Sequence, residues 1–222
     1  MTNLEKKCIT FILQCVFGNI DDPVTASIDR AYVDMASHTM QGFKEEEYQD
    51  KWKCRYDASK KIKESVENYD EICKKGYDKW HDDLCLALKD IYPEKTKFSY
   101  GQAQKWVNMT TKYLTVLAVI FKSVGEDERL DEIPRFFKED HVNSLHIPLD
   151  SYIMQEYGIS NYGPWSQMEK DEYRKCREVI KEHDKTLMDE LTDWGIAAAK
   201  HRTDDKKSYA YFVEMQRTNK EK

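Results

Sequence analysis

Apolar residues recur every three or four positions along most of this chain, which is the spacing of one face of an α-helix. No alternation of apolar and polar residues persists beyond a few positions, as a half-buried strand would require. Glycine (8) and proline (5) are scarce, which also disfavours a fold of many short strands. The sequence therefore predicts an all-α fold. Helices are expected over about 3–17, 23–40, 44–75, 78–91, 99–124, 128–138, 148–158, 166–193 and 206–216.

The segment 99–124 is the least charged of these helices, and we expect it to be the buried centre of the fold. Ser99 and Gln102 form a capping box, in which each side chain can bond to the other residue's backbone N–H. Apolar residues then follow on nearly all sides of the helix, which is typical of a helix surrounded by protein. The long helix at 44–75 has sparse apolar positions and many charges, so it is expected to be peripheral or to form a partner surface.

The composition limits the class of protein. Charged residues make up 34% of the 222 residues and hydrophobic residues 40%, which suits a well-solvated helical protein. The length allows a single domain over 1–222, with lobes at 1–95 and 96–222 as a variant of it. The formal net charge of −6 lacks the strongly basic balance expected of a nucleic-acid-binding chain, although a local basic strip remains compatible with it.

Cysteine usage and hydropathy favour a cytoplasmic protein without a membrane segment. The six cysteines form no CxxC pair and no Cys/His group with zinc-ligand spacing, so no metal site is predicted. No segment is both long and uncharged enough to span a bilayer. The apolar run near the N-terminus contains Thr10 and Gln14 and has no small-residue cleavage site, so we interpret it as an amphipathic helix, not a signal peptide.

Polar residues at the start of the 99–124 helix are the strongest indication of chemistry. Lys105, Asn108 and Lys112 are three and four positions apart and so share one face. A lysine half-buried on such a helix would have its pKa lowered by desolvation, and a neutral amine can form a Schiff base with a sugar aldehyde. Downstream, Asp150 follows a proline at the expected start of the next helix, where a carboxylate can act as an N-cap.

Two segments resemble the helix-hairpin-helix DNA glycosylases. GQAQKWVN (101–108), within 98–112, is similar to the hairpin-to-helix segment of that family, and IPLD (147–150), within 146–158, is similar to its V-P-V-D segment. Ala103 stands where the family has a second glycine. The resemblance implies that Lys105 is the Schiff-base lysine of a bifunctional glycosylase/AP lyase, and that Asp150 assists it and stabilises a developing sugar cation.

The same resemblance implies a DNA-binding surface around these residues. Gly101 and the helix start would contact DNA phosphate, and a flipped-out base would stack on aromatic side chains. The remaining candidate binding residues are Gln102, Gln104, Trp106, Asn108, Lys112 and His146. Gln104 and Asn108 are suited to reading a base edge, and His146 to positioning Asp150 or a phosphate. No cofactor is predicted, since the chain has no P-loop and no cysteine cluster for an iron–sulfur site.

Each of these residues also has a purely structural interpretation, and two other functions stay open. Lys105 can be a solvated helix lysine, Asp150 an ordinary N-cap and Trp106 a core residue. The first alternative function is a non-catalytic helical adaptor that binds a protein partner through the 44–75 helix. The second is a protein that binds a nucleotide or another anionic ligand at the positive start of the 99–124 helix. The decisive observation is whether Lys105 and Asp150 meet in one cleft.

Overall fold

The structure is a computed structural model that describes residues 1–36, 39–40, 42–44, 47–68, 74 and 76–204. Within these ranges every regular element is a helix, so the prediction of an all-α fold is confirmed. The α-helices are α1 (Asn3–Phe17), α2 (Pro23–Ala36), α3 (Tyr48–Glu67), α5 (Tyr77–Ile91), α6 (Tyr100–Val124), α7 (Asp127–Asp131), α8 (Ser151–Glu156), α9 (Lys170–Glu182) and α10 (Leu187–Asp204). Short 3-10 turns connect them: η2 (Glu94–Thr96), η3 (Arg135–Phe137), η4 (Glu139–Ser144), η5 (Ser160–Tyr162) and η6 (Trp165–Gln167).

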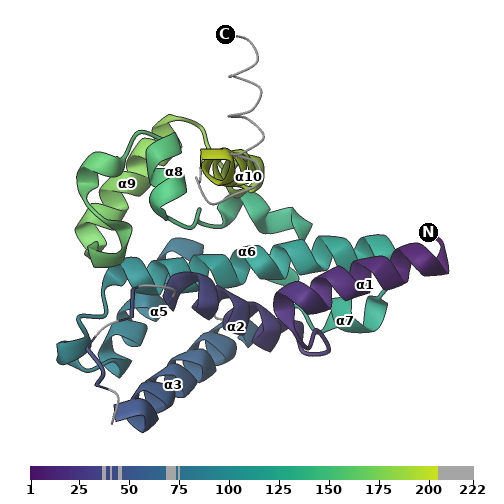
Figure 1. The fold of residues 1–222 in the computed structure, drawn as a ribbon, viewed down its shortest axis with the longest axis horizontal. Helices are drawn as coiled ribbons and strands as arrows, with labels where there is room; N and C mark the ends of the chain where they lie inside the picture. The colour runs from purple at the N-terminus through teal and green to yellow at the C-terminus, as the bar shows by residue number, and fades with distance from the viewer. Residues whose placement is uncertain (37–38, 41, 45–46, 69–73, 75, 205–222) are drawn as a thin grey trace.

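Helix α6 runs through the middle of the molecule, as expected. Helices α2, α3 and α5 lie on one side of it, and α8, α9 and α10 lie on the other (Figure 1). Every residue from 100 to 112 is buried, polar ones included. The predicted capping box is present at its start: the Gln102 amide donates to Ser99 Oγ, and the Ser99 amide donates to Gln102 Oε1. Helix α6 ends at Gly125, which adopts the left-handed conformation typical of a helix C-terminus.

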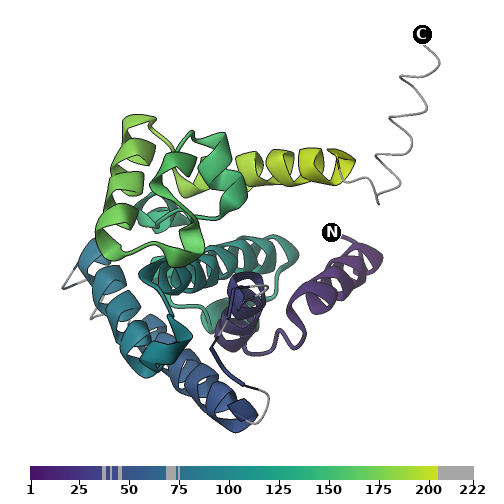
Figure 2. The same ribbon diagram turned by 60° about the vertical axis from the view of Figure 1, so that its left-hand side comes forward.

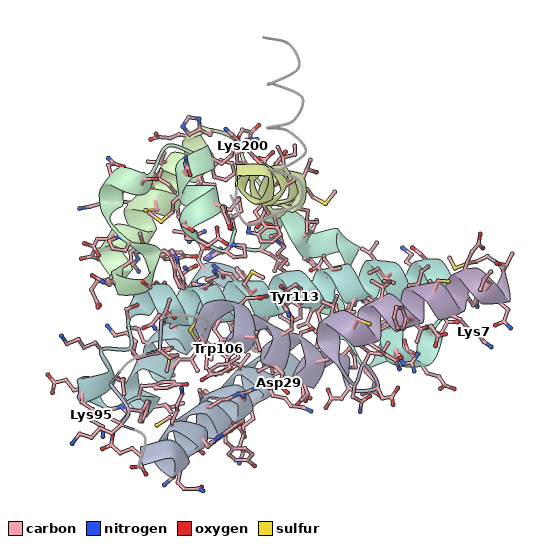
Figure 3. The ribbon with its side chains drawn as sticks, in the orientation of Figure 1. Lys7, Asp29, Lys95, Trp106, Tyr113 and Lys200 are labelled. Carbon is pink, nitrogen blue, oxygen red and sulfur yellow. The ribbon has the colours of Figure 1, made fainter. Side chains whose placement is uncertain are left out.

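The face of α6 that meets α2 carries the apolar core. Trp106 is fully buried there, packs on the Tyr32 ring with 4.9 Å between centroids, and donates from Nε1 to the Ile28 carbonyl (Figure 3). The residues of α2 that face α6 include Ile28, Tyr32 and Met35, which are all buried. Trp106 is therefore a core residue with its polar atom bonded, and it lies on the side of α6 away from the segment that carries Asp150.

Several helix boundaries differ from the sequence-based expectation. The second helix ends at Ala36, and the first helix of the 44–75 segment, α3, covers Tyr48–Glu67. The helix after Pro148 begins three residues later, at Ser151, because Asp150 is its N-cap. The expected helix at 206–216 lies outside the described residues.

The expected helix 166–193 is two helices instead of one. Its capping box forms between Glu169 and Glu172, not between Ser166 and Glu169, because Ser166 lies in η6 and its carbonyl accepts a bond from the Ser99 hydroxyl. The chain then breaks between α9 and α10, where Asp184 has a φ of 52°. Gly195 lies inside α10 and does not interrupt it.

Candidate functional site: a buried lysine–aspartate pair

The polar face of α6 is enclosed by the segment 146–194. Helices α8, α9 and α10 of that segment lie on one side of α6 (Figure 2). The predicted shared face of Lys105, Asn108 and Lys112 is real, because all three side chains contact that segment. The charged and amide groups on this face are thus inside the protein, in contact with partners from elements far away in sequence.

Lys105 and Asp150 meet inside this interface. Lys105 Nζ lies 3.6 Å from Asp150 Oδ2, and the two residues are 8% and 7% exposed. Lys105 Nζ also lies 4.3 Å from the centre of the Trp165 ring, within range for a cation–π interaction. The amine therefore has a carboxylate beside it and an indole over it, and little of it reaches solvent.

Asp150 is held rigidly by backbone and indole donors. Its Oδ1 accepts bonds from the Tyr152 and Ile153 amides, at 3.0 and 3.1 Å, as an N-cap does. Its Oδ2 accepts a bond of 3.0 Å from Trp194 Nε1. The structural and functional interpretations of Asp150 are thus compatible: one oxygen caps α8 and the other faces the lysine.

The protein surroundings of Lys105 favour the neutral form of its amine more strongly than bulk water does. Burial lowers the pKa of the Lys105 ammonium below its ordinary value of 10.5, and the charge of Asp150 opposes this shift. The charge of Lys112 acts in the same direction as burial. A lysine with a lowered pKa is more readily a nucleophile, because more of it is deprotonated at a given pH.

A second buried pair lies beside the first. Lys112 Nζ is 2.6 Å from Glu190 Oε2 and 5.5 Å from the centre of the Trp194 ring. Burial raises the pKa of the Glu190 carboxyl, against the effect of Lys112, and the Asp150 charge adds to the rise. Two cations and two acids therefore interact in one enclosed cluster, with Trp165 and Trp194 covering it.

The amides on the same face are used by the protein itself. Gln104 Nε2 donates to the Leu149 carbonyl and Gln104 Oε1 accepts from the Leu149 amide. Asn108 Nδ2 lies within bonding distance of Gln104 Oε1, the Ile147 carbonyl and the Tyr173 hydroxyl. These bonds hold the 147–149 segment against α6 and so place Asp150 opposite Lys105.

The groups predicted to bind phosphate at the start of α6 are bonded within the protein. The Gly101 amide donates to the Met168 carbonyl at 2.8 Å, and a Cβ on Gly101 would lie 1.7 Å from the Trp165 carbonyl oxygen. Gln102 is occupied by the capping box and by a bond from its Nε2 to the Thr39 carbonyl. The Trp165 backbone occupies the space left by the missing Gly101 side chain, and the Gly101 amide is bonded to Met168. This amide is therefore not available to a phosphate.

His146 belongs to a separate buried network. Its Nδ1 lies 3.0 Å from the Tyr173 hydroxyl and its Nε2 lies 2.6 Å from Asp78 Oδ1. Burial lowers the pKa of the His146 imidazole to about 4, although the bond to Asp78 acts in the opposite direction. A neutral ring would donate from Nε2 to Asp78 and accept at Nδ1 from Tyr173. His146 therefore positions Tyr173, and no contact joins it to Asp150.

A surface cleft near α6 lies beside the pair, and neither Lys105 nor Asp150 lines it. It measures about 760 Å³ and is lined at the helix start by Ser99, Gln102, Ser166 and Gln167. In the described ranges, no three histidine, cysteine, aspartate or glutamate side chains gather where they could hold a metal ion. Over the same residues, none of the helices has the length and apolar character needed to cross a membrane.

Comparison with family models, with curated proteins and with solved structures finds no match to this chain. The interpretation of the site therefore depends on its geometry. The sequence analysis named Lys105 and Asp150 as candidate site residues but did not name Glu190 or Trp194. A helical spacing in α10 is the one signal that could have indicated them, since they are four positions apart and share a face.

Proposed function

We propose that Lys105 is an amine nucleophile that forms a Schiff base with a sugar aldehyde, as in a DNA glycosylase/AP lyase, with Asp150 as the assisting carboxylate. The observation that supports this most is the 3.6 Å contact between Lys105 Nζ and Asp150 Oδ2 in an enclosed cluster that lowers the lysine pKa. The resemblance of 101–108 and 147–150 to that family points to the same two residues.

The reaction needs the Lys105 amine, the Asp150 carboxylate and one proton from solvent. The neutral Lys105 amine adds to the aldehyde carbon, and the resulting carbinolamine takes up that proton and loses water to give a protonated imine. The Asp150 carboxylate, held by the Trp194 and backbone donors, would stabilise the positive charge that forms beside it. The enclosed setting strengthens that interaction, because little water screens it.

Access to the amine sets a condition on this proposal. Trp165 covers Lys105, and it belongs to the short turn η6, between η5 and α9. A substrate would reach Nζ only after the Trp165 ring moves off it. The Gly101 amide is already bonded to the Met168 carbonyl, so it does not serve as a contact to DNA phosphate.

Borohydride trapping tests the proposal directly. The protein is incubated with an oligonucleotide carrying one abasic site, and separately with 2-deoxyribose 5-phosphate, and then reduced. We expect a covalent adduct that Lys105→Met abolishes. Lys112→Met is the matched control, since it removes the neighbouring buried ammonium and leaves the nucleophile. An adduct that survives Lys105→Met, or none with either probe, would show the pair to be structural.

A second candidate function is a helical adaptor that binds an acidic peptide through α3. A groove of about 510 Å³ between α2 and α3 is lined by Trp52, Arg55, Tyr56, Lys60 and Lys63 among others. Trp52 and Tyr56 are 44% and 68% exposed, and α3 has six basic and four acidic residues in a chain of net charge −6. In this groove Arg55 pairs with Asp29 of α2, and Lys63 pairs with Asp22, which precedes that helix. The exposed aromatics and the nearby exposed Lys60 suit a peptide with an apolar anchor and an acidic residue.

Titration with a designed acidic peptide that carries leucine anchors, followed by fluorescence of a label on the peptide, tests this candidate. Binding should weaken with added salt and should be lost in a Trp52→Ala, Tyr56→Ala double variant. Lys105→Met should leave it unchanged. If the double variant binds the peptide as tightly as the unaltered protein, the groove is not the binding site.

A further inference from the structure

The N-terminal helix α1 lies at the edge of the fold and covers little of it. Among its 15 residues Leu13 alone is buried, and Figures 1 and 2 show α1 as an arm beyond the layers on either side of α6. It contacts the body through the buried Leu13, through Ile9 and through the Phe17 ring, whose centroid is 5.1 Å from that of Tyr113. Lys7, near its outer end, is labelled far from the core residue Trp106 (Figure 3).

The exposed face of α1 is apolar. Leu4, Phe11, Ile12 and Val16 are 72%, 62%, 57% and 42% exposed, and Cys8 and Cys15 are exposed beside them. The helix is nevertheless well formed at both ends, with a capping box between Thr2 and Glu5 and Gly18 after its last residue. A locally stable helix with a wide exposed apolar face is typical of an interaction surface.

The spacing on this face is that of a helix–helix seam. Leu4, Cys8, Phe11 and Cys15 are four, three and four positions apart, which is the heptad spacing of a coiled coil. Large and small side chains alternate along the seam. We define these four residues as the α1 seam.

We propose that the α1 seam binds the α1 seam of a second copy of this chain in an antiparallel pair. In that arrangement Leu4 faces Cys15 of the partner subunit and Phe11 faces Cys8 of the partner subunit, so that each layer combines one large and one small side chain. A parallel pair would instead place large against large and small against small. An isologous contact of this kind closes on itself as a dimer.

Charge also favours the antiparallel copy. The positive N-terminal end of each α1 would lie beside the loop after the other helix, where the Asp21 side chain is 71% exposed while it pairs with Arg129 at 2.8 Å. The flanking charges Glu5 and Lys7 would face the uncharged Ile12 and Gln14 of the other helix, so no like charges meet. Two helices of about 22 Å bury less than the roughly 1,200 Å² of a tight interface, so we expect dissociation at micromolar concentration.

Sedimentation equilibrium of the full chain at about 5 and 100 μM tests the proposal. We expect a dimer at the higher concentration that Phe11→Glu converts to a monomer. Ile196→Glu is the matched control, because Ile196 in α10 is 63% exposed and lies outside the seam. It should leave the dimer intact, and circular dichroism should show the same helix content in all three proteins. A monomer at both concentrations, or a dimer that persists in the Phe11→Glu variant, overturns the proposal.

Crosslinking then tests the orientation. In a Cys8→Ser background, Leu4→Cys places a new thiol opposite Cys15 of the partner subunit, and mild oxidation should give a covalent dimer. Adding Cys15→Ser should abolish that product. Rapid Cys8–Cys8 crosslinking of the unaltered chain would instead indicate a parallel pair and would overturn the arrangement. Binding of monomers to phosphatidylcholine–phosphatidylserine vesicles, lost with Phe11→Glu, would assign the seam to a lipid surface and also overturn it.

Discussion

The Asp150 carboxylate connects three helices through its two oxygens: Oδ1 caps α8, and Oδ2 lies between Trp194 Nε1 of α10 and Lys105 Nζ of α6. One side chain thus fixes a helix start, bonds to α10 and sits beside the central helix. Loss of the carboxylate should therefore weaken all three of these contacts.

Asp150→Ala should therefore be strongly destabilising. It removes the N-cap and leaves the Lys105 ammonium buried without a counter-charge, for which we expect a loss of about 3–5 kcal/mol in the free energy of unfolding. Asp150→Asn keeps a capping oxygen and should cost clearly less. Urea unfolding of both variants measures the difference, and equal losses would show that the retained capping oxygen contributes nothing.

The reactivity of Lys105 should depend on pH in a defined direction. Because burial lowers its pKa, the neutral amine appears as the pH rises through a midpoint below 10.5. The rate of reductive adduct formation at Lys105, read by mass spectrometry of the modified peptide, should rise through that midpoint. A midpoint at or above 10.5 would contradict the lowered pKa.

Acid should destabilise the fold through His146. Its folded pKa of about 4 lies below the ordinary 6.5, so the unfolded chain takes up a proton first as the pH falls. The stability is fully present above pH 6.5 and is lost progressively towards pH 4, by about 3 kcal/mol for this group. His81, whose pKa is also lowered by burial, should add to the loss.

Unfolding measurements between pH 7.5 and about 4 would follow this loss. A His146→Gln variant should show a shallower decline than the unaltered protein, since Gln does not titrate. Declines of equal steepness would place the acid sensitivity elsewhere.

Gly101→Ala should disrupt the junction between α6 and η6. The new methyl group would lie 1.7 Å from the Trp165 carbonyl oxygen, a backbone atom that can move only if the chain around it moves. We expect a loss of about 3 kcal/mol or more. Gly195→Ala is the matched control: nothing lies within 4 Å of its Cβ in α10, so helix propensity should stabilise it by about 0.5–1 kcal/mol. Thermal unfolding of both would compare them.

Much of the fold follows from local sequence, because helix starts and stops depend on neighbouring residues. The capping box at Ser99 and Gln102, the buried character of 99–124 and the stop at Gly18 are all local, and all are found as predicted. The alternative starts at Ser166 and Glu169 are both chemically reasonable. Which one forms depends on the contact of Ser166 with Ser99, and no local pattern contains it.

The sequence by itself determined that this is an all-helical protein, and that a lysine, an amide and a second lysine share one face of its central helix. Only the tertiary structure decided that this face is enclosed, with Asp150 beside Lys105 and Glu190 beside Lys112. Helical periodicity fixes which side chains point the same way. What they point at depends on packing between segments 45 and 78 residues apart, and such packing leaves no periodic signal in the chain.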